Sequence, residues 1–366
     1  MSSQLPDIDK ITQFLTACQI VDGPLSGGIQ DGYHLNKQSY DFIYSETTGY
    51  AIIYFLNHYR WTGNDQFLHY AVLAADFLIN HLTKNGLPYN FAIAGSEPDR
   101  RYFVFDNAIC AQGLADLFLV LGDPKYRQAA EEIGRWLLTM YQDGDNFLSY
   151  LNEFDQIVDH PGTTFADDRG CLHIKNAIAF LKIQKISSDQ SWRKTAEAIL
   201  VAGLDRQNTF GGFPLQRSSH EIFSHAHCYV TEGYLFGYLA LGTKEYLRAA
   251  ERSATYLTTI QSPDGGIYQF NQRGQRASDA TAQAIRIWQT LDYINKKKHF
   301  AEPINRGWHY LKKMQYTSDD LGNGAILYTR GRFGLRTPIG FTWVAMFTGS
   351  AASICSAGRI LIEEIY

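Results

Sequence analysis

The sequence predicts an all-α protein in which six helical hairpins close into a ring, an (α/α)6 toroid with six inner and six outer helices. Two cues that recur six times along its 366 residues carry this prediction. The first is a turn rich in Gly or Asn, and the second is a polar residue that opens a strongly helical stretch. Self-similarity at a period of about 60 residues indicates a repeat architecture. The turns are centred on Gly28, Gly86, Asp145, Gly212, Gly266 and Gly324. The helix-opening residues are Glu46, Asp106, His173, His225, Asp279 and Thr342.

Each repeat is expected to pair an inner helix with an outer one. The stretch Thr48–Tyr59 is nearly all apolar or small, as a helix buried on most sides must be, whereas Gln66–Leu82 has apolar residues on one face only. Gly63 ends the first helix and separates it from the second. The other predicted inner helices are Asp106–Leu121, His173–Ile186, Ala226–Leu241, Asp279–Ile294 and a last one that begins near Phe341. The other predicted outer helices are Ile8–Ile20, Lys125–Tyr141, Ser191–Leu204, Lys244–Ile260 and His299–Met314.

The connections explain why a closed ring is favoured. Inner-to-outer connections are a few residues long, whereas outer-to-inner connections run to about 20–30 residues and hold the turns. An apolar inner layer is best buried when the repeats close on themselves, because an open solenoid would need a more polar concave face. No linker separates the repeats, so we expect a single domain over residues 1–366 although the length alone suggests two. In a closed ring the inner helices begin around one mouth, beside the long loops.

Composition narrows the function classes. The net charge of −4 without a basic block argues against a nucleic-acid partner. The N-terminus lacks the pattern of a secretory signal, and no stretch of eighteen uninterrupted apolar residues predicts a membrane span. The five cysteines are scattered, which favours reduced thiols and a cytoplasmic location. We expect a monomer or a small homo-oligomer.

Polar residues that open the inner helices should converge at the mouth. Spacing places His225, Tyr229 and Glu232 on one helix face, and Asp279, Gln283 and Arg286 on another, each set at i, i+4, i+7. The carboxylates among the opening residues could act as helix caps. Alternatively, crowding at one cavity would raise their pKa values, and a pair of carboxyl groups in different protonation states is what glycosidic chemistry needs.

Arginines and aromatic residues occupy the long loops. We call the arginines the arginine collar, and they are interpreted either as partners of an anionic substrate or as partners of nearby carboxylates. Aromatic side chains such as Tyr44 and Trp343 lie at the ends of these loops or at the helix starts and could stack on sugar rings. The collar comprises Arg100, Arg101, Arg169, Arg217, Arg273, Arg276, Arg330, Arg332 and Arg336.

Histidines offer another chemistry. His173, His225 and His227 near helix starts could transfer protons or contact a substrate. A zinc site using Cys171 or Cys228 with these histidines is conceivable, but no familiar ligand spacing supports it. We therefore expect no metal and no cofactor.

Two segments resemble the six-hairpin glycosidase superfamily, nearest to the unsaturated glucuronyl and rhamnogalacturonyl hydrolases. Phe105–Ala108 (FDNA) resembles the start of their second inner helix. Ser278–Ala284 (SDATAQA) resembles their D-(S/T)-(S/G)-x-A-I segment. The resemblance implies that Asp106 is the acid/base. Where those enzymes carry a Trp-containing segment, this chain has Ser224–Tyr229 (SHAHCY), which is closer to the N-acylglucosamine 2-epimerase group. That second resemblance implies proton transfer by histidines.

The leading hypothesis is therefore a glycoside hydrolase-like enzyme that acts on anionic, uronic-acid-containing oligosaccharides or polysaccharide fragments. A sugar epimerase that uses histidines and a non-catalytic saccharide-binding protein are the alternatives. Two carboxylates about 5–10 Å apart would favour hydrolysis, and two histidines across a small cavity would favour epimerisation. The candidate catalytic residues are Asp106, Glu46, Asp279, His225 and His227. The candidate substrate-binding residues are His173, Glu232, Gln283, Arg276, Arg336, Tyr229, Trp343 and Tyr44.

Overall fold

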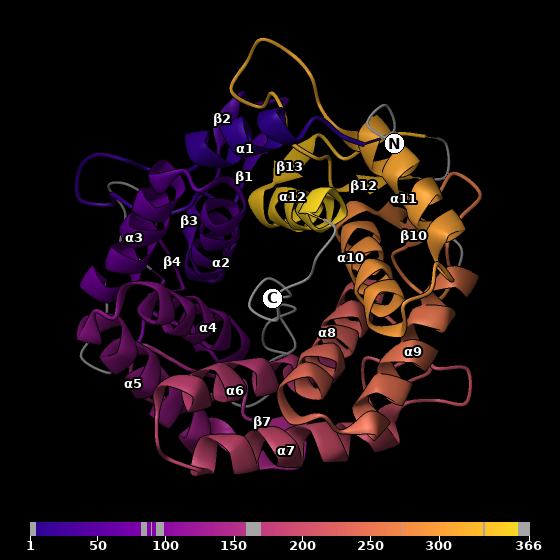
Figure 1. Ribbon diagram of the computed structural model, residues 1–366. Coiled ribbons are helices and arrows are strands. Elements are labelled where there is room, and N and C mark those ends of the chain that lie inside the picture. The colour runs from indigo at the N-terminus through magenta and orange to yellow at the C-terminus, as the bar shows by residue number, and fades with distance from the viewer. Residues whose placement is uncertain are drawn as a thin grey trace.

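The computed structural model describes residues 5–81, 86–88, 90–92, 99–158, 170–272, 274–331 and 334–357. Within these residues twelve α-helices alternate between an inner and an outer layer and close a ring, which confirms the predicted toroid (Figure 1). The inner helices are α2 (Ser45–Thr62), α4 (Val104–Leu121), α6 (Asn176–Ile186), α8 (Ser224–Leu241), α10 (Ser278–Asn295) and α12 (Thr342–Ala357). The outer helices are α1 (Ile8–Ala17), α3 (Asp65–Asn80), α5 (Pro124–Met140), α7 (Ser191–Gly203), α9 (Lys244–Thr259) and α11 (Ala301–Met314).

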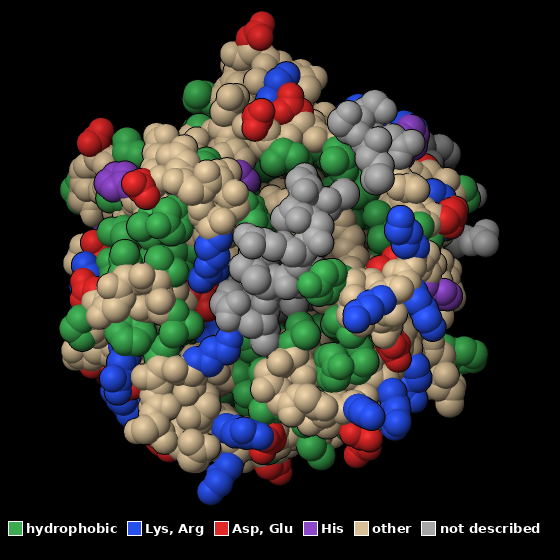
Figure 2. All heavy atoms as spheres, in the orientation of Figure 1, with side chains coloured by type: hydrophobic (Ala, Val, Ile, Leu, Met, Phe, Trp, Pro, Cys, Tyr) green, Lys and Arg blue, Asp and Glu red, His purple; other side chains and the backbone are tan. Residues whose placement is uncertain are grey.

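The two layers differ in burial as their sequences predict. In α4 every residue from Val104 to Leu117 is buried, whereas α9 buries one face that includes Tyr246, Ala250 and Leu257. By length and composition α4 would also suit a membrane span, but 78% of it is buried inside the protein, which is where a core helix belongs. On the face shown in Figure 2, Lys and Arg side chains are interspersed with Asp and Glu around the rim of the ring.

The third inner helix begins differently from its prediction. The segment η2 (Cys171–Lys175) forms a 3₁₀ turn, and the α-helix starts at Asn176 rather than at His173. Short 3₁₀ turns are common at helix N-termini, where the first backbone N–H groups have no partner within the helix. The other inner helices also start within three residues of the predicted positions, but no 3₁₀ turn directly precedes them in the described residues.

Neighbouring loops cap the inner helices. The N–H of Ser45 donates to the carbonyl oxygen of Asn90 at 2.9 Å, and the N–H of Ser278 donates to that of Tyr328 at 2.8 Å. The residues preceding α2, α4, α8 and α10 make no side-chain cap hydrogen bond. Glu46 and Asp106 lie inside the first turns of α2 and α4 and not at the cap positions, whereas Asp279 of α10 accepts the N–H of Ala280, as a capping side chain does.

Short strands join the long loops. Strand β1 (Gly32–His34) in the first loop pairs antiparallel with β13 (Ile339–Phe341) in the last loop, with Gly32 opposite Phe341, and so closes the ring. The loop before α2 also pairs with the loop before α4, and that loop pairs with the loop before η2. The loop before α10 pairs with the loop before α12. The remaining strands are β2 (Ser39–Tyr40), β3 (Ile43–Tyr44), β4 (Phe91–Ala92), β5 (Tyr102–Phe103), β6 (Tyr141–Asp143), β7 (Asn146–Phe147), β8 (Tyr150–Leu151), β9 (Ile157–Val158), β10 (Ile267–Tyr268), β11 (Arg276–Ala277) and β12 (Thr329–Arg330).

The recurring glycine turns dock on the outer helices. In four repeats one Gly of the turn has a φ between 91° and 96°, and a Cβ there would overlap the backbone carbonyl oxygen of an outer helix. Only a residue without a side chain allows both this backbone conformation and this close approach. The four glycines are Gly27 against α3, Gly211 against α9, Gly265 against α11 and Gly324 against α1.

Gly265→Ala is expected to lower the free energy of unfolding by about 2–4 kcal/mol, because it combines an unfavourable φ with a backbone clash against Arg306. Gly63→Ala is the control: its φ is also positive, at 66°, but nothing lies within 4 Å of the added Cβ. It should cost about 1 kcal/mol. Urea unfolding of both variants measures the difference, and equal losses would contradict the docking role of the turn.

Candidate active site

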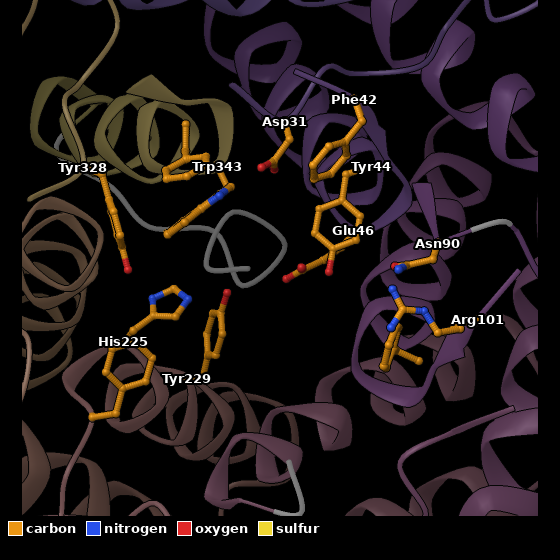
Figure 3. Close-up of a pocket in the computed structure, with 13 residues that line it drawn as sticks. Asp31, Phe42, Tyr44, Glu46, Asn90, Arg101, His225, Tyr229, Tyr328 and Trp343 are labelled. Atoms are coloured by element: carbon orange, nitrogen blue, oxygen red, sulfur yellow. The ribbon is translucent and has the colours of Figure 1, made fainter. Parts of the chain in front are cut away.

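A cavity of about 390 Å³ lies where the inner helices begin, between the long loops (Figure 3). Carboxyl groups, aromatic rings and one imidazole face it, and they come from opposite sides of the ring. Its size is typical of a site for a small ligand. The lining residues are Asp31, Phe42, Tyr44, Glu46, Asn90, Arg101, Phe103, Phe223, His225, Tyr229, Tyr328, Phe341 and Trp343.

Glu46 and Asp106 form a carboxyl pair bridged by Tyr44. The Tyr44 hydroxyl donates a hydrogen bond to Oδ2 of Asp106 at 2.9 Å. Glu46 is half-buried and lines the cavity, whereas Asp106 lies behind it with 1% of its surface exposed. Burial raises the pKa of Asp106 to about 7, although Tyr44 opposes the shift. Burial and then the charge of Asp106 raise the pKa of Glu46 well above its usual value. A ligand in the cavity therefore meets Glu46 first.

Asp31 is a third carboxyl group at the cavity, and sequence reasoning missed it. It accepts a hydrogen bond from the Thr47 hydroxyl at 3.0 Å. Burial raises its pKa to about 7, and the charge of Asp41 acts in the same direction, while Thr47 opposes it. The signal was its position three residues after the Gly27–Gly28 turn, in a loop that borders the mouth. Asp31 adds to the acidic character of the side of the cavity that carries Glu46.

Aromatic rings form the other side of the cavity. Trp343, Phe341 and Tyr328 form a cluster with ring centroids 5.2–5.4 Å apart, and Phe341 stacks on Trp343 at an interplanar angle of 24°. Trp343 and Tyr44 are at the cavity as the sequence suggests, but the contributions of Tyr328 and Phe341 were missed because 51 aromatic residues gave too little discrimination. Such a surface suits the apolar face of a sugar ring.

His225 faces the cavity and is held from behind by α10. Its Nδ1 lies 2.8 Å from Oε1 of Gln283 and 3.2 Å from Oδ2 of Asp279. Burial lowers the pKa of His225 to about 3 and raises that of Asp279 to about 7. Asp279 is fully buried, and its Oδ1 accepts the N–H of Ala280. Thus Asp279, a candidate catalytic residue, and Gln283, a candidate substrate ligand, both contact His225 and do not line the cavity.

An ion cluster lies deeper on the ring axis. The carboxylate of Glu232 binds Lys175 at 2.7 Å and is paired with Arg286, and it accepts a hydrogen bond from Nε2 of Gln283 at 3.2 Å. Although burial acts in the opposite direction, Arg286 and Lys175 hold the pKa of Glu232 below its usual value. Lys175 also lies 4.0 Å from the ring centroid of Tyr229, which lines the cavity as predicted. The two helix faces predicted from i, i+4, i+7 spacing therefore contact each other, and Glu232, a candidate substrate ligand, is fully buried and does not line the cavity.

The other two candidate histidines are outside the cavity. Nδ1 of His227 accepts the N–H of Phe213 at 3.2 Å, and its Nε2 contacts the Ser253 hydroxyl of α9 at 2.8 Å. His173 is fully buried beside Phe147, and its Nδ1 lies 3.1 Å from the Asn176 amide. Among the described lining residues His225 is the one histidine. The two-histidine arrangement considered from the sequence is therefore not assembled by His173, His225 and His227.

Three of the six described collar arginines, Arg217, Arg276 and Arg330, bind carboxylates away from the cavity. Arg276 pairs with Asp264 at 3.1 Å, and Arg336 is exposed; neither lines the cavity, so their role in binding substrate stays a prediction. Arg101 does line it, while its guanidinium also binds Asp99 at 2.7 Å. Three collar residues, Arg169, Arg273 and Arg332, lie outside the described residues.

The described part of the chain contains no group of three or more His, Cys, Asp or Glu side chains arranged to hold a metal ion. The four cysteines whose side chains are described are buried and form no disulfide with one another.

Comparisons with known proteins place the fold. No family model and no curated protein matches the sequence. Solved structures do match the fold of this chain. A sugar epimerase from a ruminal bacterium aligns with a TM-score of 0.77 and 14% identity over 97% of this chain and 100% of its own. Cellobiose 2-epimerase from Bacillus thermoamylovorans B4167 aligns with a TM-score of 0.75 and 13% identity over 95% of this chain and 98% of its own. The unsaturated glucuronyl hydrolase of Bacillus sp. GL1 aligns with a TM-score of 0.69 and 14% identity over 96% of this chain and 97% of its own.

The chain has the fold of the six-hairpin enzymes. These structures include an unsaturated glucuronyl hydrolase, from the group that the sequence resembles first, and two sugar epimerases. At 13–14% identity the likeness extends to the fold alone, so the function must be argued from the cavity.

Proposed function

We propose that the protein is a sugar-processing enzyme that hydrolyses the terminal unit of a short oligosaccharide, with Glu46 as the proton donor. The observation that carries the proposal is the carboxyl pair, in which buried Asp106 stands behind a Glu46 that lines the cavity. Burial and the neighbouring charge favour the protonated form of Glu46, as a general acid requires. The proton donor expected from the sequence, Asp106, becomes the group that raises the pKa of Glu46.

The aromatic side of the cavity supports a sugar as the substrate. Rings of Tyr328 and Trp343 offer stacking surfaces opposite Glu46, so that a sugar held there would present its glycosidic oxygen to the acid. The cavity volume of about 390 Å³ suits one terminal unit, with the rest of the chain directed outwards. The likeness to sugar hydrolases and epimerases supports the same substrate class.

Arg101 is the proposed partner of a uronate carboxylate, because it is the described member of the arginine collar that lines the cavity. Arg101→Ala should weaken the binding of a uronate-terminated disaccharide by about 1–3 kcal/mol, the value of a charge-assisted hydrogen bond, and leave a neutral disaccharide nearly unaffected. Calorimetry with both sugars measures this. Arg336→Ala, exposed and off the cavity, is the matched control and should change neither affinity. Equal losses for both sugars would exclude carboxylate recognition by Arg101.

Sugar epimerisation is the second candidate, favoured by the position of His225 across the cavity from Glu46 (Figure 3). One experiment separates the candidates. The protein is incubated in D₂O with unsaturated-uronyl, saturated-uronyl and neutral disaccharides, and the products are followed by NMR. New reducing ends indicate hydrolysis, and deuterium at the carbon next to the anomeric centre indicates epimerisation. Binding with neither signal indicates the non-catalytic alternative.

A further inference from the structure

We propose that Asp279 and Gln283 are positioning residues that act through His225. They hold its imidazole with the proton on Nδ1, which makes Nε2 the nitrogen that accepts hydrogen bonds, and we assign it a sugar hydroxyl in the cavity as a donor. The sugar belongs to the proposed function, but the protonation pattern of the ring rests on the geometry of this protein alone. The inference follows from a chain of hydrogen bonds that leads from the ion cluster to the cavity.

This series of hydrogen bonds begins at Glu232. Because Lys175 and Arg286 both bind its carboxylate, Glu232 is held in the ionised form, which accepts hydrogen bonds and donates none. The Gln283 side chain lies against Oε1 of this carboxylate at 3.2 Å. Its amide must therefore turn the NH₂ group towards Glu232, because the reverse orientation would set two acceptors against each other.

This orientation decides the tautomer of His225. With its NH₂ group on Glu232, Gln283 presents Oε1 to Nδ1 of His225 at 2.8 Å. An amide oxygen carries no hydrogen, so Nδ1 must be the donor. Asp279 Oδ2 lies 3.2 Å from the same nitrogen without a hydrogen bond to it, so its contribution is electrostatic. A neutral imidazole has one N–H, so Nε2 carries the lone pair.

The surroundings of His225 keep the imidazole neutral. The charged groups near it are Lys175 and Glu232, both in the ion cluster, and Asp279 on α10. From α12 and from its own helix the neighbours are rings: Trp343 at 5.1 Å and Tyr229 at 4.2 Å between centroids. Burial, the dominant effect, lowers the pKa of His225 to about 3, so one tautomer persists through the neutral range.

The test is ¹⁵N NMR of the ring nitrogens in the free, full-length protein labelled at histidine, with the His225 signals identified by their loss in His225→Gln. In the wild type, Nδ1 of His225 should give the protonated signal and Nε2 the unprotonated one. Gln283→Met removes the acceptor without removing bulk, and Asp279→Asn keeps the shape and is the milder change. In Gln283→Met the proton should move to Nε2 in part or in whole, and in Asp279→Asn the shift should be smaller.

Ser253→Ala is the matched control, because it alters the partner of the buried His227 and should move the His227 signals and leave those of His225 in place. A wild-type His225 protonated on Nε2, or an unchanged tautomer in Gln283→Met, would overturn the proposal. The readout needs no substrate, so absence of sugar turnover would count against the proposed function alone. With an active sugar, Gln283→Met should raise KM more than it lowers kcat, whereas a merely structural role would lower the folded fraction and leave KM unchanged.

Discussion

Glu46→Gln is expected to lower turnover of a glycoside by about 10²–10⁴-fold, the range for loss of general acid catalysis. The amide keeps the size and the hydrogen-bonding capacity of the carboxyl group but has no proton to transfer. Because burial and Asp106 raise the pKa of Glu46, the wild-type acid stays protonated towards neutrality, and activity should fall as pH rises through that pKa. The rate–pH profile and thermal melting of the variant are the measurements, and the melting temperature should change little.

Asp106→Asn distinguishes the role of Asp106 from that of Glu46. Removing the charge of Asp106 removes one cause of the raised pKa of Glu46, so the fall in activity should move to lower pH. Turnover near pH 7 should drop, and acidification should restore it. The Tyr44 hydroxyl keeps an oxygen acceptor in this variant. If instead Asp106→Asn is inactive at every pH and Glu46→Gln retains its turnover, Asp106 is the proton donor that the sequence suggested.

Glu232→Gln is expected to lower the free energy of unfolding by about 3–5 kcal/mol, because it leaves two buried cations without their carboxylate. Lys175 and Arg286 are both at most 4% exposed and both bind Glu232. Burial already lowers the pKa of Lys175 to about 8, while Glu232 opposes that shift. Without Glu232 the pKa of Lys175 should fall further below its unfolded value. The unfolded state then binds more protons, so the stability of the variant should rise with pH until the unfolded lysine titrates.

Urea unfolding at pH 7 and pH 9 measures this loss and its recovery. The control is Glu245→Gln, since Glu245 pairs with Arg248 on the surface of α9, where both side chains are more than half exposed. Exposed pairs contribute little, so this variant should unfold almost like the wild type. A Glu232→Gln protein as stable as the control would show that the cluster does not hold the ring together.

His225 and His227 illustrate how far the sequence reaches into the site. Two residues along a helix lie about 200° apart around its axis, so these side chains cannot share a face. That rule was available from the sequence and excluded a paired role at one cavity. Which of the two faces the cavity depends on the rotation of α8 within the ring, and α9 decides it by engaging His227 through Ser253.

The sequence by itself determined the helices, their inner and outer layers, the ring, and the two polar faces of α8 and α10. Each of these depends on local periodicity, which the residues carry wherever the helices are placed. The tertiary structure alone decided that Glu46 lines the cavity while Asp106 lies behind it, and that Asp279 contacts His225. It also decided that most of the described collar arginines bind carboxylates, since these outcomes depend on helix rotation and on contacts between residues far apart in sequence.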